Sequence, residues 1–503
     1  MRAIAAVLVL AAVACSSSSG VHPVADDPPP SVGAPPVAPS VAARRLAVTV
    51  EGSGAIRSDP VGIDCPGACA ADFRAATNVR LIAIADNDWV FDVFTGSCAG
   101  AVCDLTLSTD ASVSAHFDRG RARLSVGMVG SGGGRITSEP PGIDCPGRCS
   151  ATFPAGTLVR LSASAGALSR FSGWSGQCTA TDCQVRVHAD TAAVARFELR
   201  RYAVMPLASA QSISWTMSPR SGLVAGAYFS AGTFFWDGLL HDVGMAWPTD
   251  LHGINDSGTI VGVNGAAPDF RAFRWERGLA TDLGTLGGTY SWAEAINAAG
   301  VIAGWAELAG GGVHAVSWAD GPAIDLGSID PAHCDYSEAY GINSNGIIVG
   351  ESCVAGAFHP VRFREPGVID DLGSWGGSYG RAVAINDVGV IVGYATRPGR
   401  STYHAFIWTE GTTLRDVGSL PGLAHSYLGC INSAGVAAGI SFDENDVVRR
   451  GIVWGEDRLI ELNDLVVPGP YFIDSAACVD ESGRIAATSV FDGQWRAVLL
   501  TPL

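Results

Sequence analysis

The sequence predicts an all-β protein in which two small disulfide-bearing β modules precede a seven-bladed β-propeller closed by an N-terminal strand. One observation is a motif of a small residue, Ile, Asn, two variable residues and Gly, found in clear or weaker copies seven times between Ser212 and the C-terminus. Another is a set of four cysteines that recurs once, every member displaced by 80 residues. The 63 Gly and 26 Pro are also typical of short strands joined by turns.

The length and the charge narrow the classes of function. At 503 residues the chain is long enough for several domains. All 32 basic residues are Arg, and the formal net charge of −17 would repel a phosphate backbone. Because no basic stripe offsets this charge, we expect no nucleic-acid partner.

The N-terminal residues carry an export pattern. Arg2 precedes an apolar run over Ile4–Ala12, and a small-residue cleavage site then ends in Cys15. This pattern resembles a bacterial lipoprotein signal, which implies that residues 1–14 are removed and that Cys15 carries the lipid. Ala12 departs from that pattern, since Leu is usual there. The alternative is a plain secretory signal in which Cys15 is incidental.

Residues 15–44 are predicted to be a stalk. They are rich in Ser, Pro and Ala, cannot bury a core and favour extended conformers. Ser16, rather than Asp, follows Cys15, and by the same resemblance this implies sorting to the outer membrane. We therefore expect an exported protein that a lipid holds at the outer membrane or cell surface. No other segment of the sequence is long and apolar enough to cross a bilayer.

Residues 45–119 and 120–199 are predicted to be two copies of one β module. The hexapeptide Gly-Ile-Asp-Cys-Pro-Gly occurs at 62–67 and again at 142–147, and alternating apolar runs predict half-buried strands. Four cysteines allow three connectivities in each module, of which we favour the local one. The favoured pairs are Cys65–Cys69, Cys98–Cys103, Cys145–Cys149 and Cys178–Cys183. The alternative is a four-cysteine zinc site in each module, which an oxidising compartment disfavours.

The second module also carries a characteristic series of glycines and aromatic residues. Residues 142–149 read Gly-Ile-Asp-Cys-Pro-Gly-Arg-Cys, and residues 171–178 read Phe-Ser-Gly-Trp-Ser-Gly-Gln-Cys. This series resembles the divergent InlB B-type bacterial repeat, which implies a surface spacer rather than an enzyme. The first module departs from it, with Phe94 in place of Trp174. We expect Trp174 to be a core residue, and a sugar-stacking platform is the alternative.

Residues 200–503 are predicted to be the propeller, because each full copy of the repeat holds four short apolar runs. In the third copy these runs are Glu294–Asn297, Val301–Trp305, His314–Trp318 and Ala323–Leu326. The last copy lacks a fourth run, whereas Tyr202–Leu207 is an unassigned strand ahead of the first copy. We expect this strand to complete the last blade, since closure removes exposed sheet edges.

Two further signatures recur in the propeller region. The third run reads His-Ala-Phe at 404–406 and partly keeps that pattern at 314–316 and 271–273, while residues 283–288 read Leu-Gly-Thr-Leu-Gly-Gly. These signatures resemble the HAF repeat family of extracellular proteins over roughly 202–503. The resemblance implies an exported repeat protein.

Two sets of polar residues are candidates for ligand binding. One set opens the third run of each copy and consists of Gly232, Arg271, His314, His359, His404, Arg450 and Arg496. These residues lie on different blades, too far apart to share a metal ion, so we expect hydrogen bonds to the Asp of the next strand. The other set comprises the turn pairs at 255–256, 386–387 and 480–481, which offer too few oxygens for calcium and favour Asx turns. We expect no metal and no cofactor.

Four cysteines remain in the propeller region. Cys334 and Cys353 flank a hairpin nearly opposite one another and are predicted to form a disulfide. Cys430 and Cys478 occupy equivalent small positions of neighbouring blades and are predicted to be buried thiols.

No motif of a known catalytic class occurs. The favoured function is therefore a monomeric, non-catalytic binding module for a glycan or protein ligand, presented on the stalk and two spacer domains. The alternative is a polysaccharide-active propeller enzyme with acidic residues at the channel mouth. Three carboxylates and a His converging in one funnel would favour the enzyme.

Overall fold

A computed structural model describes residues 42–179, 182–229, 232–245, 249–266 and 268–503. Within these ranges the chain forms strands, one 3-10 helix and no α-helix, as the predicted all-β class requires. None of the described residues belongs to a helix long and apolar enough to span a membrane. The predicted signal, Cys15 and nearly all of the predicted stalk lie outside the described ranges. The chain divides into two compact units, Met1–Asp118 and Arg119–Leu503.

The first unit contains one module of two four-stranded sheets. Its strands are β1 (Ala43–Glu51), β2 (Gly54–Asp59), β3 (Asp64–Cys65), β4 (Ala70–Arg74), β5 (Asn78–Ala85), β6 (Trp89–Gly96), β7 (Cys103–Thr106) and β8 (Ala111–Arg119). The sheet orders are β4-β1-β8-β6 and β3-β2-β5-β7, with β1 and β8 parallel. Leu46, Ile56 and Val113 belong to one core shared by both sheets, because alternate residues of each strand face it.

The second unit begins with a module of the same plan. Its strands are β9 (Arg121–Val129), β10 (Gly134–Glu139), β11 (Asp144–Cys145), β12 (Ser150–Pro154), β13 (Thr157–Ala165), β14 (Ser169–Gly176), β15 (Cys183–Val187) and β16 (Thr191–Leu199). The sheet orders are β12-β9-β16-β14 and β11-β10-β13-β15. Trp174 is 8% exposed and belongs to the core of this module, so it is a packing residue and not a surface platform.

The rest of the second unit, here called the array, consists of seven four-stranded antiparallel sheets. The first three sheets hold β18 (Ser212–Met217), β19 (Val224–Tyr228), β20 (Thr233–Trp236), β21 (Leu240–Asp242); β22 (Thr249–Ile254), β23 (Ile260–Asn264), β24 (Arg271–Glu276), β25 (Leu279–Asp282); and β26 (Gly287–Ile296), β27 (Ile302–Leu308), β28 (Val313–Trp318), β29 (Ile324–Gly327). The next two hold β30 (Ser337–Ile342), β31 (Ile348–Val354), β32 (Ala357–Glu365), β33 (Val368–Asp371); and β34 (Gly380–Ile385), β35 (Ile391–Thr396), β36 (Tyr403–Trp408), β37 (Arg415–Gly418). The sixth holds β38 (His425–Ile431), β39 (Ala437–Phe442), β40 (Arg449–Gly455) and β41 (Arg458–Glu461), and a 3-10 helix η1 (Leu462–Asp464) follows.

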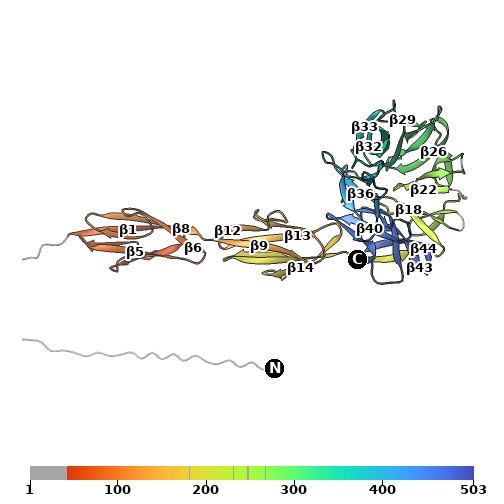
Figure 1. Ribbon diagram of the computed structural model, residues 1–503. Helices are drawn as coiled ribbons and strands as arrows, with labels where there is room; N and C mark the ends of the chain where they lie inside the picture. Colours follow the sequence, from red (N-terminus) through yellow and green to blue (C-terminus); the bar gives the residue numbers. More distant parts are fainter. Residues whose placement is uncertain (1–41, 180–181, 230–231, 246–248, 267) are drawn as a thin grey trace, which may run out of the picture. The chain divides into compact units, whose positions relative to one another are not determined.

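The seventh sheet joins the two ends of the array. It is ordered β17-β44-β43-β42, from β17 (Tyr202–Pro206), β42 (Phe472–Val479), β43 (Ile485–Phe491) and β44 (Gln494–Pro502). Strand β17 pairs antiparallel with β44, and Val204 lies opposite Leu500. The first strands β18, β22, β26, β30, β34, β38 and β42 contact one another in series, and β42 also contacts β18. In Figure 1 the yellow-green β18 lies beside the blue β43 and β44, which come from the opposite end of the array.

The repeated turn motif connects the first and second strands of each sheet. In the third sheet, Gly300 N donates to Asn297 O at 3.0 Å, and Gly300 has a φ of +84°, which favours glycine. The Asn297 side chain caps the turn, since its Oδ1 accepts from Ala299 N and Val301 N. The predicted Asx turns are therefore present, and they set the start of each second strand.

Candidate ligand-binding site

Every first strand of the array contains a β-bulge at the same point. The pairing register skips one residue in each strand, three positions before the turn residue, and a bulge of this kind re-aims a side chain. The bulged residues are Trp215, His252, Glu294, Tyr340, Val383, Gly429 and Ala477. They differ in every sheet, whereas the turn residues around them repeat.

The residue after each bulge is small because neighbouring first strands come very close there. A Cβ added at Gly341 would lie 2.6 Å from Val383 O, and one at Gly253 would lie 3.2 Å from the Ala295 Cα. At the same position of β38 and β42 stand Cys430 and Cys478. The prediction of two buried thiols is wrong, because the structure joins them in a disulfide with a Cα–Cα distance of 5.0 Å. The close approach that demands small residues also brings the two sulfur atoms within bonding reach.

The motif asparagines link the sheets to one another. Each of the five buried Asn side chains donates from Nδ2 to the backbone carbonyl of the corresponding turn in the next sheet. The bonds are Asn255 to Asn297 O (3.3 Å), Asn297 to Asn343 O (3.1 Å), Asn343 to Asn386 O (3.1 Å), Asn386 to Asn432 O (2.9 Å) and Asn432 to Asp480 O (3.0 Å). From the seventh sheet, Glu481 N donates to Pro219 O in the first at 2.7 Å. We call this series the asparagine chain.

The acidic residues beside the asparagine chain accept hydrogen bonds from the backbone. Asp256 Oδ1 accepts from Arg220 N and Ser221 N at 2.8 Å, and Asp387 Oδ1 accepts from Ser344 N at 2.8 Å. Burial raises the pKa of the Asp256 carboxyl, but these hydrogen bonds and the Arg220 charge lower it overall. Among the described residues, no group of three or more His, Cys, Asp or Glu side chains is arranged to hold a metal ion.

The turn end of the array is closed by an ion pair. Turn residues of all seven sheets line a cavity of only about 70 Å³ there. Arg220 of the first sheet reaches Asp387 of the fifth, with Nη2 3.3 Å from Oδ2. A ligand-sized space must therefore be sought at another place.

The residues that open the third strands make hydrogen bonds within their own sheets, as expected. Their partners are the acidic residues of the fourth strands. The pairs are Arg271–Asp282 (2.9 Å), His314–Asp325 (2.9 Å), His359–Asp371 (2.9 Å), His404–Asp416 (3.2 Å) and Arg450–Glu461 (3.4 Å). Arg496 donates to Ser209 O and to Gln494 Oε1, and Gly232 has no side chain to offer. This set stabilises each sheet and does not form a common site.

Five charged residues gather on four neighbouring sheets, and we call them the charged cluster: His252, Glu294, Glu338, Glu351 and Arg381. His252 Nδ1 lies 2.6 Å from Glu294 Oε2, and Arg381 Nε lies 2.8 Å from Glu351 Oε2. Arg381 Nη2 also lies 3.6 Å from Glu338 Oε2. Burial opposes the positive charge of His252, but the Glu294 carboxylate outweighs it and raises the His252 pKa.

Glu338 has the most perturbed carboxyl of the cluster. Burial and the charge of Glu351 raise its pKa, Tyr336 and Arg381 oppose the rise, and the resulting pKa is about 7. The hydroxyls of Tyr336 and Tyr340 both donate to the Glu338 carboxyl oxygens. Glu338 is thus held near the midpoint of its titration at neutral pH.

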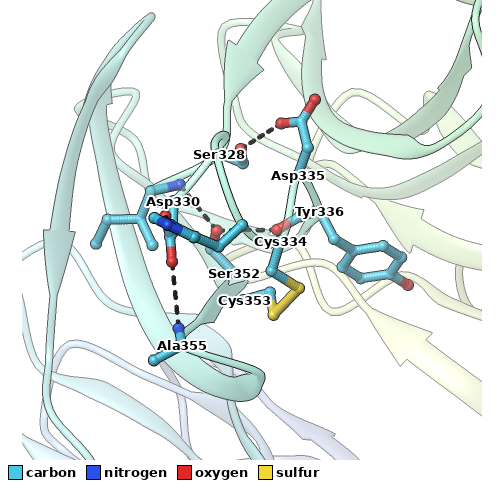
Figure 2. Close-up of a disulfide and its surroundings, with 10 residues drawn as sticks. Ser328, Asp330, Cys334, Asp335, Tyr336, Ser352, Cys353 and Ala355 are labelled. Atoms are coloured by element: carbon cyan, nitrogen blue, oxygen red, sulfur yellow. Dashed lines mark hydrogen bonds and ion pairs between the residues drawn. A yellow bond between two sulfur atoms is a disulfide. The ribbon is translucent and has the colours of Figure 1, made fainter.

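A disulfide fixes the segment that carries Tyr336. Figure 2 shows the Cys334–Cys353 bond beside Tyr336, with Ser352 Oγ donating to Tyr336 O at 2.9 Å. Cys353 N donates to the same carbonyl at 3.0 Å. The bond ties the loop before β30 to β31, and so it sets the position of the Tyr336 side chain against Glu338.

A larger cavity, of about 540 Å³, is lined mainly by residues of the first, fifth, sixth and seventh sheets and is here called the aromatic cavity. Its lining includes the rings of Trp215, Phe229, Tyr427 and Trp495, together with an Arg449–Asp474 ion pair at 3.2 Å. Three small or medium bulged residues complete it, namely Val383, Gly429 and Ala477. Small side chains at these bulges leave room, whereas the bulges of β22, β26 and β30 carry His252, Glu294 and Tyr340.

The cysteines predicted as disulfides are all joined in the expected pairs. The Cα–Cα distances are 4.5 Å for Cys65–Cys69, 5.7 Å for Cys98–Cys103, 4.5 Å for Cys145–Cys149, 5.1 Å for Cys178–Cys183 and 5.6 Å for Cys334–Cys353. These bonds leave no thiolates for the zinc alternative in either module. Cys15 lies outside the described residues.

Neither the charged cluster nor the aromatic cavity was predicted from the sequence. Their members do not recur between copies, and residues such as His252 and Glu294 are separated by a whole repeat. The sequence held one usable signal. The residue three positions before each motif Asn differs in every copy of the repeat, whereas the residues that follow it are of the same type in each clear copy.

Known proteins resemble parts of this chain. Among solved structures, a putative TolB from Agrobacterium tumefaciens is 13% identical with a TM-score of 0.36, over 52% of this chain and 94% of that one. The gluconolactonase XC5397 from Xanthomonas campestris is 13% identical with a TM-score of 0.33, over 60% and 90% of the two chains. Similarities this low carry no argument about function, and no curated protein matches the chain. Residues 47–121 and 124–201, by contrast, each match the family model of the divergent InlB B-repeat domain, which confirms that resemblance for the two modules.

Proposed function

We propose that this protein is an exported, lipid-anchored, non-catalytic binding protein whose array is a closed seven-bladed β-propeller of HAF type. Closure is supported by the pairing of β17 with β44 and by the contact of β42 with β18. The asparagine chain supports it as well, since its bonds run from sheet to sheet and return to the first. A closed ring of such sheets leaves only short, protected edges, which suits a protein that works outside the cell.

Export and anchoring are supported by the use of cysteine. The chain has 13 cysteines, and the twelve that are described form six disulfides. Disulfides at this density are typical of oxidising compartments. Cys15 then remains as the cysteine for the lipid, at the end of a pattern that resembles a lipoprotein signal.

The observation that carries the binding function is the aromatic cavity. Its volume of about 540 Å³ lies in the range of small-molecule pockets, about 300–1,000 Å³. The cavity combines aromatic faces with a few polar groups, which is the usual composition of such sites. The two modules and the stalk would act as spacers that hold this cavity away from the membrane.

Two measurements test this proposal. In the Cys15→Ala variant the protein should move from the membrane pellet to the soluble fraction; a variant that pellets like the parent protein contradicts the anchor.

For binding, Trp215 and Trp495 report on the cavity by their fluorescence, and we expect a saturable change with one of three pools: neutral oligosaccharides, acidic oligosaccharides or peptides. No change with any pool would contradict the binding function.

The charged cluster favours a second candidate, a polysaccharide-active enzyme. Three carboxylates and a His meet in it, and Glu338, with a pKa of about 7, is poised to give or take a proton at neutral pH. Its groups are, however, already paired with one another, which is also how a structural network is satisfied. Release of reducing ends from polysaccharides, abolished by Glu338→Gln, would favour the enzyme over the binding protein.

A further inference from the structure

We infer that the aromatic cavity recognises an uncharged saccharide, so that the ligand class of the proposed binding protein is a neutral glycan. This inference rests on the proposed binding function and on three features of the cavity: its exposed rings, its paired charges and its small lining residues.

The exposed rings are placed as a stacking surface. Phe229 and Trp495 remain 51% and 43% exposed, and their ring centroids lie 5.2 Å apart with planes tilted by 30°. Trp215 and Tyr427 line the same cavity and are partly exposed. Large rings kept in contact with water lose burial energy, so their clustering at a cavity points to a ligand with an apolar face. The C–H face of a pyranose ring is such a surface.

The charges in the cavity are balanced and already paired. Arg449 Nε lies 3.2 Å from Asp474, and Arg449 Nη1 lies 3.0 Å from Asp446. A guanidinium held by two carboxylates does not offer a free positive charge to an acidic ligand. The paired groups still present donors and acceptors to hydroxyls, because each carboxylate oxygen has more than one lone pair.

The floor of the cavity suits a compact ring better than an extended peptide. Gly429, Ala476 and Ala477 line it with little or no side chain, and Val383 is the largest aliphatic residue of the bulges there. The hydroxyl-bearing Ser475 and Thr488 lie among these small residues. A polyhydroxylated ring therefore meets small surfaces, hydroxyls and aromatic faces, which together match both of its sides.

The test uses the mature chain carrying Cys15→Ala and isothermal titration calorimetry. The probes are maltotriose, cellotriose, xylotriose, mannotriose and N,N′,N″-triacetylchitotriose, with trigalacturonate and a mixed tripeptide pool as the other classes. We expect at least one neutral trisaccharide to bind with a Kd below about 1 mM. Trp495→Ala should weaken this binding at least about tenfold, whereas Trp495→Phe should retain it.

Leu279→Ala, an exposed apolar residue of β25 outside the cavity, is the control and should leave the Kd unchanged. Binding of trigalacturonate or peptides without any neutral sugar would overturn the ligand class but keep the binding function. A neutral sugar bound equally well by the parent protein and by Trp495→Ala would overturn the assignment to this cavity. If no neutral sugar, acidic sugar or peptide produced a heat of binding, both the ligand class and the binding function would be overturned.

Discussion

At the scale of single residues, the chemistry of the array is set by the bulge of each first strand. The repeat keeps the residues around the bulge constant in type and leaves the bulged residue free to vary. Large polar residues there, His252, Glu294 and Tyr340, build the charged cluster and its surroundings. Gly429 and Ala477 at the same position instead leave the space of the aromatic cavity. One variable position per copy therefore divides the inner surface into a charged part and an open part.

Glu338 gives a prediction about pH. Its folded-state pKa of about 7 lies above the ordinary value of 4.5, so its contribution to stability is full below pH 4.5 and is lost as the pH rises through 7. In Glu338→Gln that loss should vanish. Between pH 5 and pH 8, urea unfolding of the parent protein should lose up to roughly 3 kcal/mol more than the variant does. Parallel pH curves for the two proteins would contradict this assignment of the pKa.

The residues that recur could be predicted from the sequence, and those that do not recur could not. Asn297 was predicted to cap a turn because the same Asn stands in every clear copy. Glu338 and Arg381 carry no such mark, and their contact joins residues of different sheets. A repeat shows what all copies need for folding, whereas a site is built from the differences between copies.

At the scale of elements, the turns do two tasks with one side chain. Oδ1 of each motif Asn holds the turn of its own sheet, and Nδ2 holds the next sheet. The four-run pattern also placed the strands closely: the predicted Val301–Trp305 and His314–Trp318 lie within or beside β27 (Ile302–Leu308) and β28 (Val313–Trp318). Strand β26 begins at Gly287, earlier than the predicted start at Glu294, because the repeated Ile-Asn motif marks only the C-terminal end of this strand.

Asn343→Ala tests the asparagine chain. It removes the acceptor for Asn345 N and Ile347 N and the donor to Asn386 O, so we expect a loss of about 1–3 kcal/mol in the free energy of unfolding. The control is Val388→Ala in the corresponding turn of the fifth sheet, where the apolar Val388 side chain is 71% exposed, and it should change the free energy of unfolding by less than about 0.5 kcal/mol. Equal effects of the two substitutions, measured by urea unfolding, would show that the chain of bonds adds nothing.

The Cys430–Cys478 bond gives a covalent test of the contact between the sixth and seventh sheets. Non-reducing peptide mapping should recover the two cysteines in one linked peptide pair. The double variant Cys430→Ser/Cys478→Ser should lose about 2–4 kcal/mol, as is usual for a bond that closes a loop of this size. If both cysteines were alkylated in the unfolded protein without prior reduction, the disulfide would be contradicted and the prediction of two buried thiols would stand.

The wrong prediction for Cys430 and Cys478 has a physical cause. The sequence shows that the two positions are small and equivalent, but not how near neighbouring first strands come at them. The Gly253 and Gly341 contacts show how closely neighbouring first strands approach at this position, and two cysteines placed there are within reach.

At the scale of the whole molecule, the proposed closure by β17 determines whether the other features form one site. The aromatic cavity draws its lining from strands of the first, fifth, sixth and seventh sheets, among them β18, β34, β38 and β42. The first sheet meets the seventh only if the two ends of the array come together. The ligand site, and the bond from Glu481 N to Pro219 O that returns the asparagine chain to the first sheet, thus depend on the junction of β17 with the C-terminal strands.

Hydrogen–deuterium exchange of the native protein measures this junction directly. Residues 202–206 pair with residues 498–502, so the amides of β17 that face β44 should exchange slowly, although β17 lies at the edge of its sheet. The same slow exchange should extend to residues 494–497, which pair with β43. If residues 202–206 exchanged within seconds, like an unstructured linker, while the other strands of the array stayed protected, the array would not be closed by its N-terminal strand.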